Sequence, residues 1–149
     1  MTFYAHTRRD SDQDGWQKLE VHLKEVEAIS SRLARKIGLP YAGRMIGLAH
    51  DLGKYSEAFQ QYLQHNATNA AMEMEPKLSK GSVDHSTAGA QNISRGLVRS
   101  GLAAEALALC VASHHSCLID CIEPSGEDGL TRRLKKVLKF LLRLVYLCV

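Results

Sequence analysis

The chain has 149 residues, of which 45% are hydrophobic, and it carries a formal net charge of +3. This length suits one compact domain with its own apolar core and excludes a second domain of ordinary size. The small positive charge is compatible with an anionic partner but does not require one. The longest apolar run, near the C-terminus, is interrupted by Lys139 and Arg143. It is therefore too short and too charged to span a membrane.

The first part of the chain begins with a polar segment over residues 1–14, which we expect to be a loop. From Trp16 the apolar residues recur at helical spacing, and Gly38 and Pro40 end the pattern. The inward stripe of this helix comprises Leu19, Leu23, Val26, Ser30, Leu33 and Ile37. One long helix is therefore predicted here.

The middle of the chain contains two shorter helical patterns, over about 41–51 and 56–63. Residues 65–82 show no apolar period and contain a proline. Such a segment is typical of a long surface loop, of the kind that often serves function.

The second half of the chain contains three further helices by the same criteria. The first begins near Asp84, and Gly101 separates it from the next. That next helix has one stripe formed by Ala103, Leu107, Cys110 and His114. Residues 124–129 indicate a turn, and a last helix is predicted from Leu130 to the chain end. Because no alternating strand pattern is present, we predict an all-α fold of about six helices.

Five of the seven histidines are placed so that they suit metal binding. They are His22, His50, His85, His114 and His115. His22, His85 and His114 fall on the inward faces of three different predicted helices, and the chain contains two adjacent pairs, His50-Asp51 and His114-His115. A single histidine on an apolar stripe is more often a hydrogen-bonded core residue, but this combination favours a metal site. Imidazole and carboxylate together suit first-row divalent metals.

Asp51 and Lys54 are the candidate catalytic residues. The carboxylate of Asp51 could bridge two metals about 3.5–4 Å apart, a pair that can activate water and neutralise a phosphodiester transition state. Lys54 follows Asp51 by three residues, so its ammonium could reach a phosphate oxygen or the attacking water. The alternative interpretation of Lys54 is an ordinary surface lysine. We therefore predict a hydrolase that acts on a phosphate ester.

Four strings carry a family resemblance: FYAHT (3–7), HDLGKYSEAFQQYL (50–63), VDHSTAGA (83–90) and SHH (113–115). They resemble the HD nuclease domain of the CRISPR-associated type I helicase-nuclease family, within the HD phosphohydrolase superfamily. The resemblance covers residues 3–123. It implies a single compact HD-type helical domain around a metal site, and a metal-dependent nuclease that degrades single-stranded DNA.

The resemblance also implies a ligand set for one or two divalent ions, which we expect to be Mn, Ni, Co, Fe, Zn or Mg. The matching residues are His22, His50, Asp51, His85, His114 and His115. Lys54 matches the lysine of the family's HDxxK string. Asp84 and Ser86 flank the histidine of the DHS string, and we expect Asp84 to cap a helix rather than orient a ligand. His6 matches the start of the family pattern, and we place it outside the metal shell.

The chain departs from the family pattern after His115. The family's first metal is usually completed by an Asp well downstream, and neither Asp120 nor Asp128 stands in a similar context. No Walker A string is present either. We therefore expect residues 1–149 to be an HD nuclease domain that lacks its C-terminal part and any helicase. One half of the metal site should then have fewer ligands and bind more weakly.

The last predicted helix carries a basic stripe formed by Arg132, Lys136, Lys139 and Arg143. Its ordinary interpretation is a solvated face, and its functional interpretation is a track for a DNA backbone. The final string LVYLCV is apolar on nearly all sides. We expect it to be buried against this domain, another copy of the chain or a partner.

The partners implied by the resemblance are single-stranded DNA, a helicase subunit and a CRISPR surveillance complex. The four cysteines form no CxxC pair, which favours reduced thiols and a cytoplasmic protein. Two alternatives to the nuclease stay open. One is an HD-type phosphohydrolase of nucleotides, which would need no basic stripe. The other is a catalytically incomplete metal-binding scaffold that docks to a helicase, which the missing late Asp and the apolar C-terminus favour.

Overall fold

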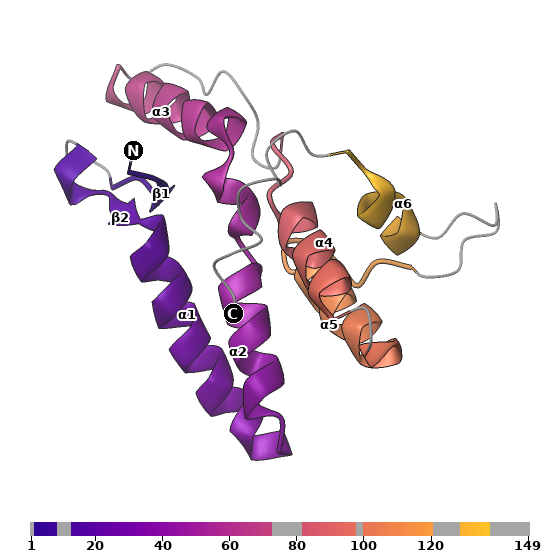
Figure 1. The fold of residues 1–149 in the computed structure, drawn as a ribbon. Helices are drawn as coiled ribbons and strands as arrows, with labels where there is room; N and C mark the ends of the chain where they lie inside the picture. The colour runs from indigo at the N-terminus through magenta and orange to yellow at the C-terminus, as the bar shows by residue number, and fades with distance from the viewer. Residues whose placement is uncertain (1, 9–12, 73–81, 98–99, 121–128, 138–149) are drawn as a thin grey trace.

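The computed structural model describes residues 2–8, 13–72, 82–97, 100–120 and 129–137 (Figure 1). The helices of this part are α1 (Leu19–Ala34), α2 (Pro40–Ala49), α3 (Glu57–Ala71), α4 (Ser86–Gly96), α5 (Leu102–Ser113) and α6 (Gly129–Lys135). Strands β1 (Tyr4–His6) and β2 (Gln17–Lys18) and the 3₁₀ turns η1 (Gln13–Gly15), η2 (Arg35–Ile37) and η3 (Leu52–Tyr55) complete it. The prediction of a helical fold is confirmed. None of the described helices is long and apolar enough to cross a membrane.

The prediction that residues 1–14 form a loop and that no strand exists is wrong at β1 and β2. The two strands pair antiparallel, with Tyr4 opposite Lys18 and His6 opposite Gln17. The carbonyl of Phe3 also accepts a hydrogen bond of 2.9 Å from the backbone N–H of Leu19. This pairing delays the start of α1 from the predicted Trp16 to Leu19. Strands of two and three residues are too short for an alternating pattern to appear in a sequence.

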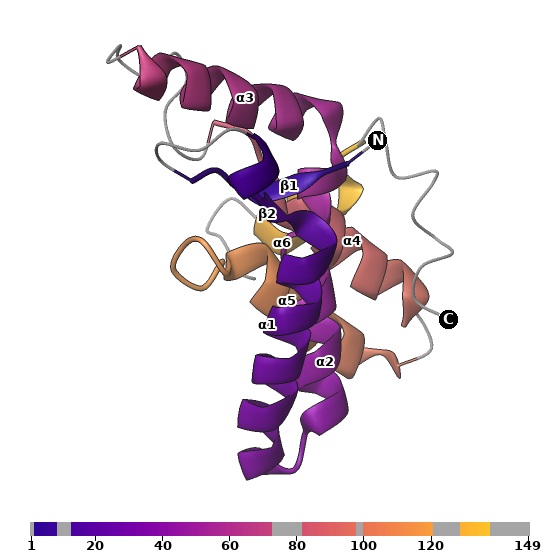
Figure 2. The ribbon, with the colours of Figure 1, turned by 90° about the vertical axis from the view of Figure 1, so that its left-hand side faces the viewer.

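Helices α1 and α2 form an antiparallel hairpin, which Gly38 turns with a left-handed φ of 75° (Figure 1). The near end of the predicted α1 stripe is buried, at Leu19 and Leu23. Its far end is not, because Leu33 and Ile37 are 52% and 74% exposed. Figure 2 shows the reason, since the far end of the hairpin extends beyond α4 and α5. An apolar stripe predicts a helix but does not show how much of that helix another element covers.

Helix α3 continues to Ala71, so the predicted loop over residues 65–82 is wrong for its first part. The serine before the helix, Ser56, caps it by accepting a hydrogen bond of 3.2 Å from the N–H of Phe59. The segment after residue 64 is rich in alanine, which favours a helix without an apolar stripe. Residues 73–81 lie outside the described part of the chain.

Helix α6 ends at Lys135, and residues 136 and 137 are not helical. The predicted continuous helix from Leu130 to the chain end is therefore wrong at these two positions. Residues 138–149, which include the apolar string LVYLCV, lie outside the described part.

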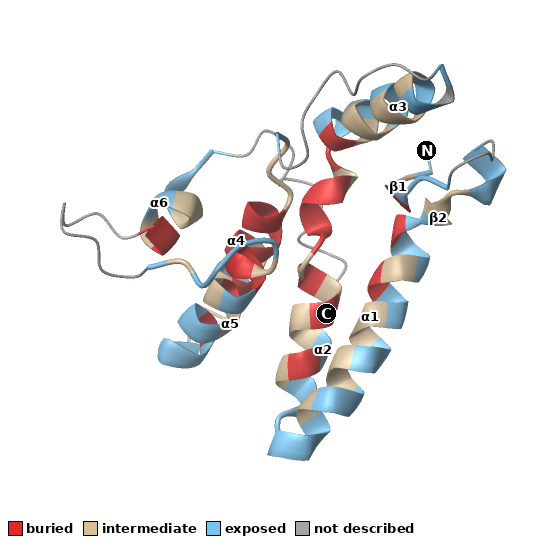
Figure 3. Cartoon of the chain, turned by 180° about the vertical axis from the view of Figure 1, so that it is seen from behind, coloured by how far each residue is buried: buried red, intermediate tan, exposed pale blue. Residues whose placement is uncertain are grey.

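The core forms where α4 and α5 pack on the end of α2, and Figure 3 shows buried residues gathered at the end of α2, in η3 and in α4. Two glycines permit this close approach. A Cβ at Gly89 would overlap the carbonyl oxygen of Ala49, and a Cβ at Gly53 would overlap the backbone of His85. The N–H of Gly53 instead donates a hydrogen bond of 3.0 Å to the carbonyl of His85. The segment that contains His85 is thereby held against the segment that contains Asp51.

Candidate metal centre

The predicted metal ligands are brought together by the ends of helices. His50 follows the last residue of α2, His85 precedes α4 and His114 follows α5. Helix α1 contributes His22, and Asp51 stands at the start of η3 with only 2% of its surface exposed. Because all these segments meet around one carboxylate, residues far apart in the sequence form a single cluster.

One oxygen of Asp51, Oδ1, faces three imidazoles. It lies 3.5 Å from Nε2 of His85, 3.3 Å from Nε2 of His114 and 3.9 Å from Nε2 of His115. Ligand atoms of these four residues all lie within 4.8 Å of one another. Both Asp51 Oδ1 and His114 Nε2 are buried without a hydrogen-bond partner. Buried polar atoms of this kind are rare and costly, and a divalent cation between them would satisfy both, so this cluster fits a metal ion.

The other oxygen of Asp51, Oδ2, faces a second cluster. It lies 3.0 Å from Nε2 of His22, 3.2 Å from Nε2 of His50 and 2.8 Å from Nζ of Lys54. The Nε2 atoms of His22 and His50 are themselves 3.1 Å apart. Two imidazole nitrogens and a carboxylate oxygen converge here, which is a donor set that also suits a first-row metal.

His6, which the sequence analysis places outside the metal shell, lies beside this second cluster. Its ring centroid is 4.9 Å from that of His22, with the two ring planes at 81°. Ligand atoms of His6, His22 and Asp51 lie within 4.8 Å of one another. The only sequence signal for this position was the string FYAHT, since the pairing of β1 with β2 that places His6 leaves no periodic pattern.

Three of the histidines are oriented by backbone carbonyls. Nδ1 of His50 contacts the carbonyl of Gly47 at 2.8 Å, and Nδ1 of His114 contacts that of Val111 at 2.7 Å. The corresponding contact of His85, with Val83, is 3.0 Å. A carbonyl oxygen can only accept, so each Nδ1 carries the proton and donates it. With the proton on Nδ1, Nε2 of a neutral ring has the free lone pair that a metal ligand requires, and in all three residues Nε2 lies on the side of Asp51.

Lys54 is not a surface residue, because only 3% of it is exposed. Besides its contact with Asp51, its ammonium donates a hydrogen bond of 3.2 Å to the carbonyl of Ala5 in β1. The ring of Phe59 lies 5.3 Å from Nζ, within range of a cation–π contact. These contacts fix a positive charge against the Asp51 carboxylate.

Burial and neighbouring charges set the protonation of the centre. Burial alone would raise the pKa of Asp51, but contacts with the imidazoles of His114, His22 and His50 hold it well below the ordinary carboxyl range. Partial burial and the nearby His114 and His85 lower the pKa of His115 to about 4. Burial also lowers the pKa of His85 and, together with Lys54, that of His6. The carboxylate is therefore ionised and these three imidazoles are neutral at physiological pH.

Asp84 and Ser86 lie behind His85. The carboxylate of Asp84 accepts hydrogen bonds from the N–H of Thr87, at 3.1 Å, and from its hydroxyl, at 2.7 Å, and so caps the first turn of α4. Partial burial would raise the pKa of Asp84, but Lys136 and Thr87 lower it to about 2. The hydroxyl of Ser86 accepts a hydrogen bond of 3.1 Å from Arg133. These contacts attach α6 to the start of α4.

The predicted basic stripe does not form a single helical face in the described residues. Lys136 follows the end of α6, and its Nζ pairs with Asp84 Oδ2 at 2.9 Å. Lys139 and Arg143 lie outside the described residues. Arg133, which is not part of the predicted stripe, donates to the carbonyl of Ala112 at 3.0 Å as well as to Ser86. Within the predicted stripe, Lys136 therefore serves to hold the end of α6 against the start of α4.

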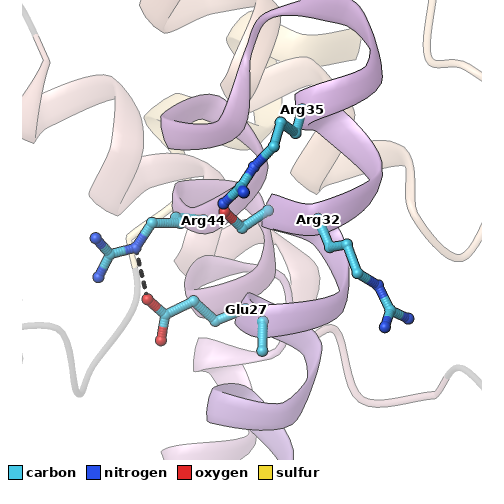
Figure 4. Close-up of a pocket in the computed structure, with 6 residues that line it drawn as sticks. Glu27, Arg32, Arg35 and Arg44 are labelled. Carbon is cyan, nitrogen blue, oxygen red and sulfur yellow. Dashed lines mark hydrogen bonds and ion pairs between the residues drawn. The ribbon is translucent and has the colours of Figure 1, made fainter.

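Other basic residues line a surface cavity of about 400 Å³ on the α1–α2 hairpin, formed by Glu27, Ala28, Ser31, Arg32, Arg35 and Arg44 (Figure 4). Nε of Arg44 donates to Glu27 at 2.7 Å, which neutralises part of the charge there. None of the histidines contributes to this cavity. Among the acidic residues considered for the late position, Asp120 is exposed and belongs to neither metal cluster, and Asp128 lies outside the described part.

Comparison with known proteins identifies the family of the chain. The family model described as "Cas3, HD domain" matches residues 4–141. A search of curated proteins found no match. The matched range includes both clusters around Asp51 and all the helices that position them. The chain therefore belongs to the Cas3 HD-domain family, a CRISPR-associated family of HD nucleases.

Proposed function

We propose that the chain is a metal-dependent nuclease that hydrolyses phosphodiester bonds of single-stranded DNA in CRISPR antiviral defence. One observation carries the proposal: the two oxygens of the buried Asp51 carboxylate face two separate groups of imidazoles. Divalent ions held there would supply an activated water and positive charge opposite the developing charge of a phosphodiester transition state.

Within this proposal the protein residues have distinct tasks. Asp51 contributes to both metal positions, one with His85, His114 and His115 and the other with His22 and His50. Lys54 fixes the orientation of the Asp51 carboxylate, because its ammonium contacts Oδ2 and is itself held by the carbonyl of Ala5 in β1. Its burial at 3% exposure favours this positioning role over direct contact with substrate.

The exposed rings indicate the side from which substrate approaches. The side chain of His115 is 58% exposed, whereas that of His85 is 13% exposed. His6 is also exposed, at the edge of the second cluster. We infer that a phosphodiester reaches the centre past these two rings. A flexible single strand can enter such a centre more readily than a rigid duplex.

The family context adds a helicase and a CRISPR surveillance complex as proposed partners. A helicase would supply the single strand on which the HD domain acts. That helicase need not be part of the same chain.

The decisive test is cleavage of circular single-stranded DNA by metal-stripped protein, with Mn²⁺, Ni²⁺, Co²⁺, Fe²⁺, Zn²⁺ or Mg²⁺ added separately. Circular duplex DNA and a panel of nucleotides serve as alternative substrates. We expect cleavage of the single strand, its loss with EDTA and its loss in Asp51→Asn. Hydrolysis of nucleotides alone would replace the proposal with a nucleotide phosphohydrolase. Metal binding without any hydrolysis would support a metal-binding scaffold instead.

A further inference from the structure

We propose that His6 is a metal ligand and that it completes the position formed by His22, His50 and Asp51. The inference rests on the proposed function, since it assigns a residue to the same centre. It concerns a histidine that comes from a strand, whereas the other histidine ligands come from helix α1 or from positions next to helix ends.

The first argument is proximity. A ring nitrogen of His6 lies within 4.8 Å of ligand atoms of both His22 and Asp51. The near-perpendicular arrangement of the His6 and His22 rings, at 81°, keeps the two rings from stacking face to face. A shared cation requires that the ligand atoms converge, and those of His6, His22 and Asp51 are already grouped together.

The second argument is that the backbone of β1 is held firmly. The side-chain amide of Gln60 accepts from the N–H of Tyr4 at 3.0 Å and donates to its carbonyl at 2.9 Å. Ala5 is 1% exposed, and its carbonyl accepts from Lys54. Strand β1 is thereby attached to α3 and η3 immediately before His6. A ligand on such a fixed backbone loses little conformational entropy when it binds.

The third argument compares the number of imidazoles near each oxygen of the Asp51 carboxylate. The Oδ1 side of Asp51 has three imidazoles nearby, His85, His114 and His115. The Oδ2 side has only His22 and His50. Adding His6 gives each position three imidazoles and one carboxylate oxygen. Among the described residues, no carboxylate other than Asp51 belongs to either cluster.

The ordinary alternative is that His6 only packs its ring against His22. The substitution His6→Phe separates the two roles, because it keeps an aromatic ring and removes both nitrogens. His65→Phe is the matched control, since His65 is an exposed histidine of α3 that belongs to neither cluster. His85→Phe provides the converse variant, which should affect the position on the Oδ1 side.

The experiment is calorimetric titration of Mn²⁺ and Zn²⁺ into the metal-stripped chain of residues 1–149. We expect two ions per wild-type chain, and we expect His6→Phe to weaken one of them at least tenfold, since removal of groups that merely support ligands already costs about 10–100-fold. His85→Phe should weaken the other ion, and His65→Phe should titrate like wild type. The visible absorption of bound Co²⁺ should change with His6→Phe, because the ligand set changes.

The outcomes separate the two proposals. If wild type binds two ions and His6→Phe binds both with unchanged affinity, His6 is not a ligand, and the proposed function stands. If His6→Phe weakens both ions equally and also lowers the unfolding temperature of the metal-free protein, its role is structural and the inference fails. A wild-type chain that binds no ion overturns both the inference and the proposed function.

Discussion

At the scale of single residues, the centre depends on one buried carboxylate and one buried ammonium. Asp51 and Lys54 are 2% and 3% exposed and lie 2.8 Å apart. Burying either charge alone would be costly, because the surrounding protein replaces the water that solvates it. In the metal-free protein the ammonium of Lys54 is the ion-pair partner of the Asp51 carboxylate.

Lys54→Met should therefore destabilise the metal-free protein by about 3–5 kcal/mol, the usual cost of removing one partner from a buried ion pair. A bound divalent ion would restore positive charge beside Asp51, so Mn²⁺ should raise the unfolding temperature more in this variant than in wild type. Thermal unfolding with and without Mn²⁺ measures both effects.

Lys24→Met is the control for that experiment, because Lys24 forms an exposed pair with Glu20 on α1. Exposed pairs of this kind contribute about 0–1 kcal/mol. If Lys54→Met and Lys24→Met lower the unfolding temperature equally, the buried pair of Lys54 and Asp51 does not stabilise the protein more than an exposed pair does.

The histidines make the stability of the metal-free protein depend on pH. In the folded state the pKa of His115 is about 4, and those of His85 and His6 are below their ordinary value. The unfolded chain binds these protons near about pH 6.5, before the folded protein does. Stability should therefore fall as pH decreases from about 6.5 towards 4. The lowered pKa of Asp51 extends the loss below pH 4.

Urea unfolding of metal-free protein between pH 8 and pH 4 tests this dependence. His115→Gln should reduce the slope, since it removes one of the groups that titrate. Stability that stays constant or increases as pH falls through this window would show that the imidazoles are not held neutral in the folded protein. The same lowered pKa values predict that the protein still binds metal at a pH somewhat below about 6.5, the ordinary pKa of histidine. At lower pH, protons displace the metal.

At the scale of helices, close contact between α2 and α4 sets the separation of Asp51 and His85. Gly89→Ala would place a Cβ against the carbonyl of Ala49, so the two helices must move apart. We expect a loss of about 1–3 kcal/mol, typical of overpacking, together with weaker metal binding. Denaturant unfolding and metal titration measure the two effects.

The same helix offers a matched control for that substitution. Gly96 lies at the end of α4, and a Cβ added to it would meet no other atom within 4 Å. Gly96→Ala should be neutral or stabilise the protein by about 0.4–1 kcal/mol, because alanine restricts the unfolded chain. If Gly89→Ala and Gly96→Ala have the same stability and metal affinity, close contact between α2 and α4 does not set the geometry of the metal centre.

Helix α6 supports the metal centre from behind. Arg133 joins Ser86, at the start of α4, to the carbonyl of Ala112, near the end of α5. Arg133→Met should cost about 1–3 kcal/mol, because hydrogen-bonding groups lose their partner, and should weaken metal binding on the His85 side. Lys135→Met, at an exposed position of the same helix, is the comparison. If the two variants have the same stability and metal affinity, α6 does not support the centre.

The helices also show which elements could be predicted from the sequence. The hairpin of α1 and α2 and the break at Gly101 follow from apolar spacing and from glycine and proline positions. The extension of α3 could not be found in this way, because its last residues lack an apolar stripe. The end of α6 at Lys135 was missed for the opposite reason, since the apolar pattern of the sequence continues through residues 136 and 137, which are not helical.

At the scale of the whole molecule, the sequence motifs predicted a cluster, and long-range contacts determine its geometry. The strings around His50-Asp51, His85 and His114-His115 indicated one metal centre, and the structure brings these residues around Asp51. The place of His6 depends on the pairing of β1 with β2, and the burial of Lys54 depends on contact with Ala5. Neither contact leaves a local pattern, so neither could be predicted.

Binding of DNA by the whole molecule should depend on salt. If single-stranded DNA is the substrate, its affinity for the metal-free chain should fall linearly on a logarithmic plot against salt concentration, through counterion release. Fluorescence anisotropy of a labelled single strand measures this slope. Lys136 should not be included in a charge-reversal variant made to test the DNA surface, because its pairing with Asp84 would confuse DNA binding with packing. Affinity that is independent of salt would argue against contact with the DNA backbone.

Whether Asp51 is shared by two metal positions can be seen in anomalous diffraction from crystals grown with Mn²⁺. We expect two anomalous peaks, one on each side of the Asp51 carboxylate. The first should be coordinated by His85, His114 and His115, and the second by His22, His50 and His6. Peaks found only at other sites, with none within coordination distance of Asp51, would show that this carboxylate does not hold the metal.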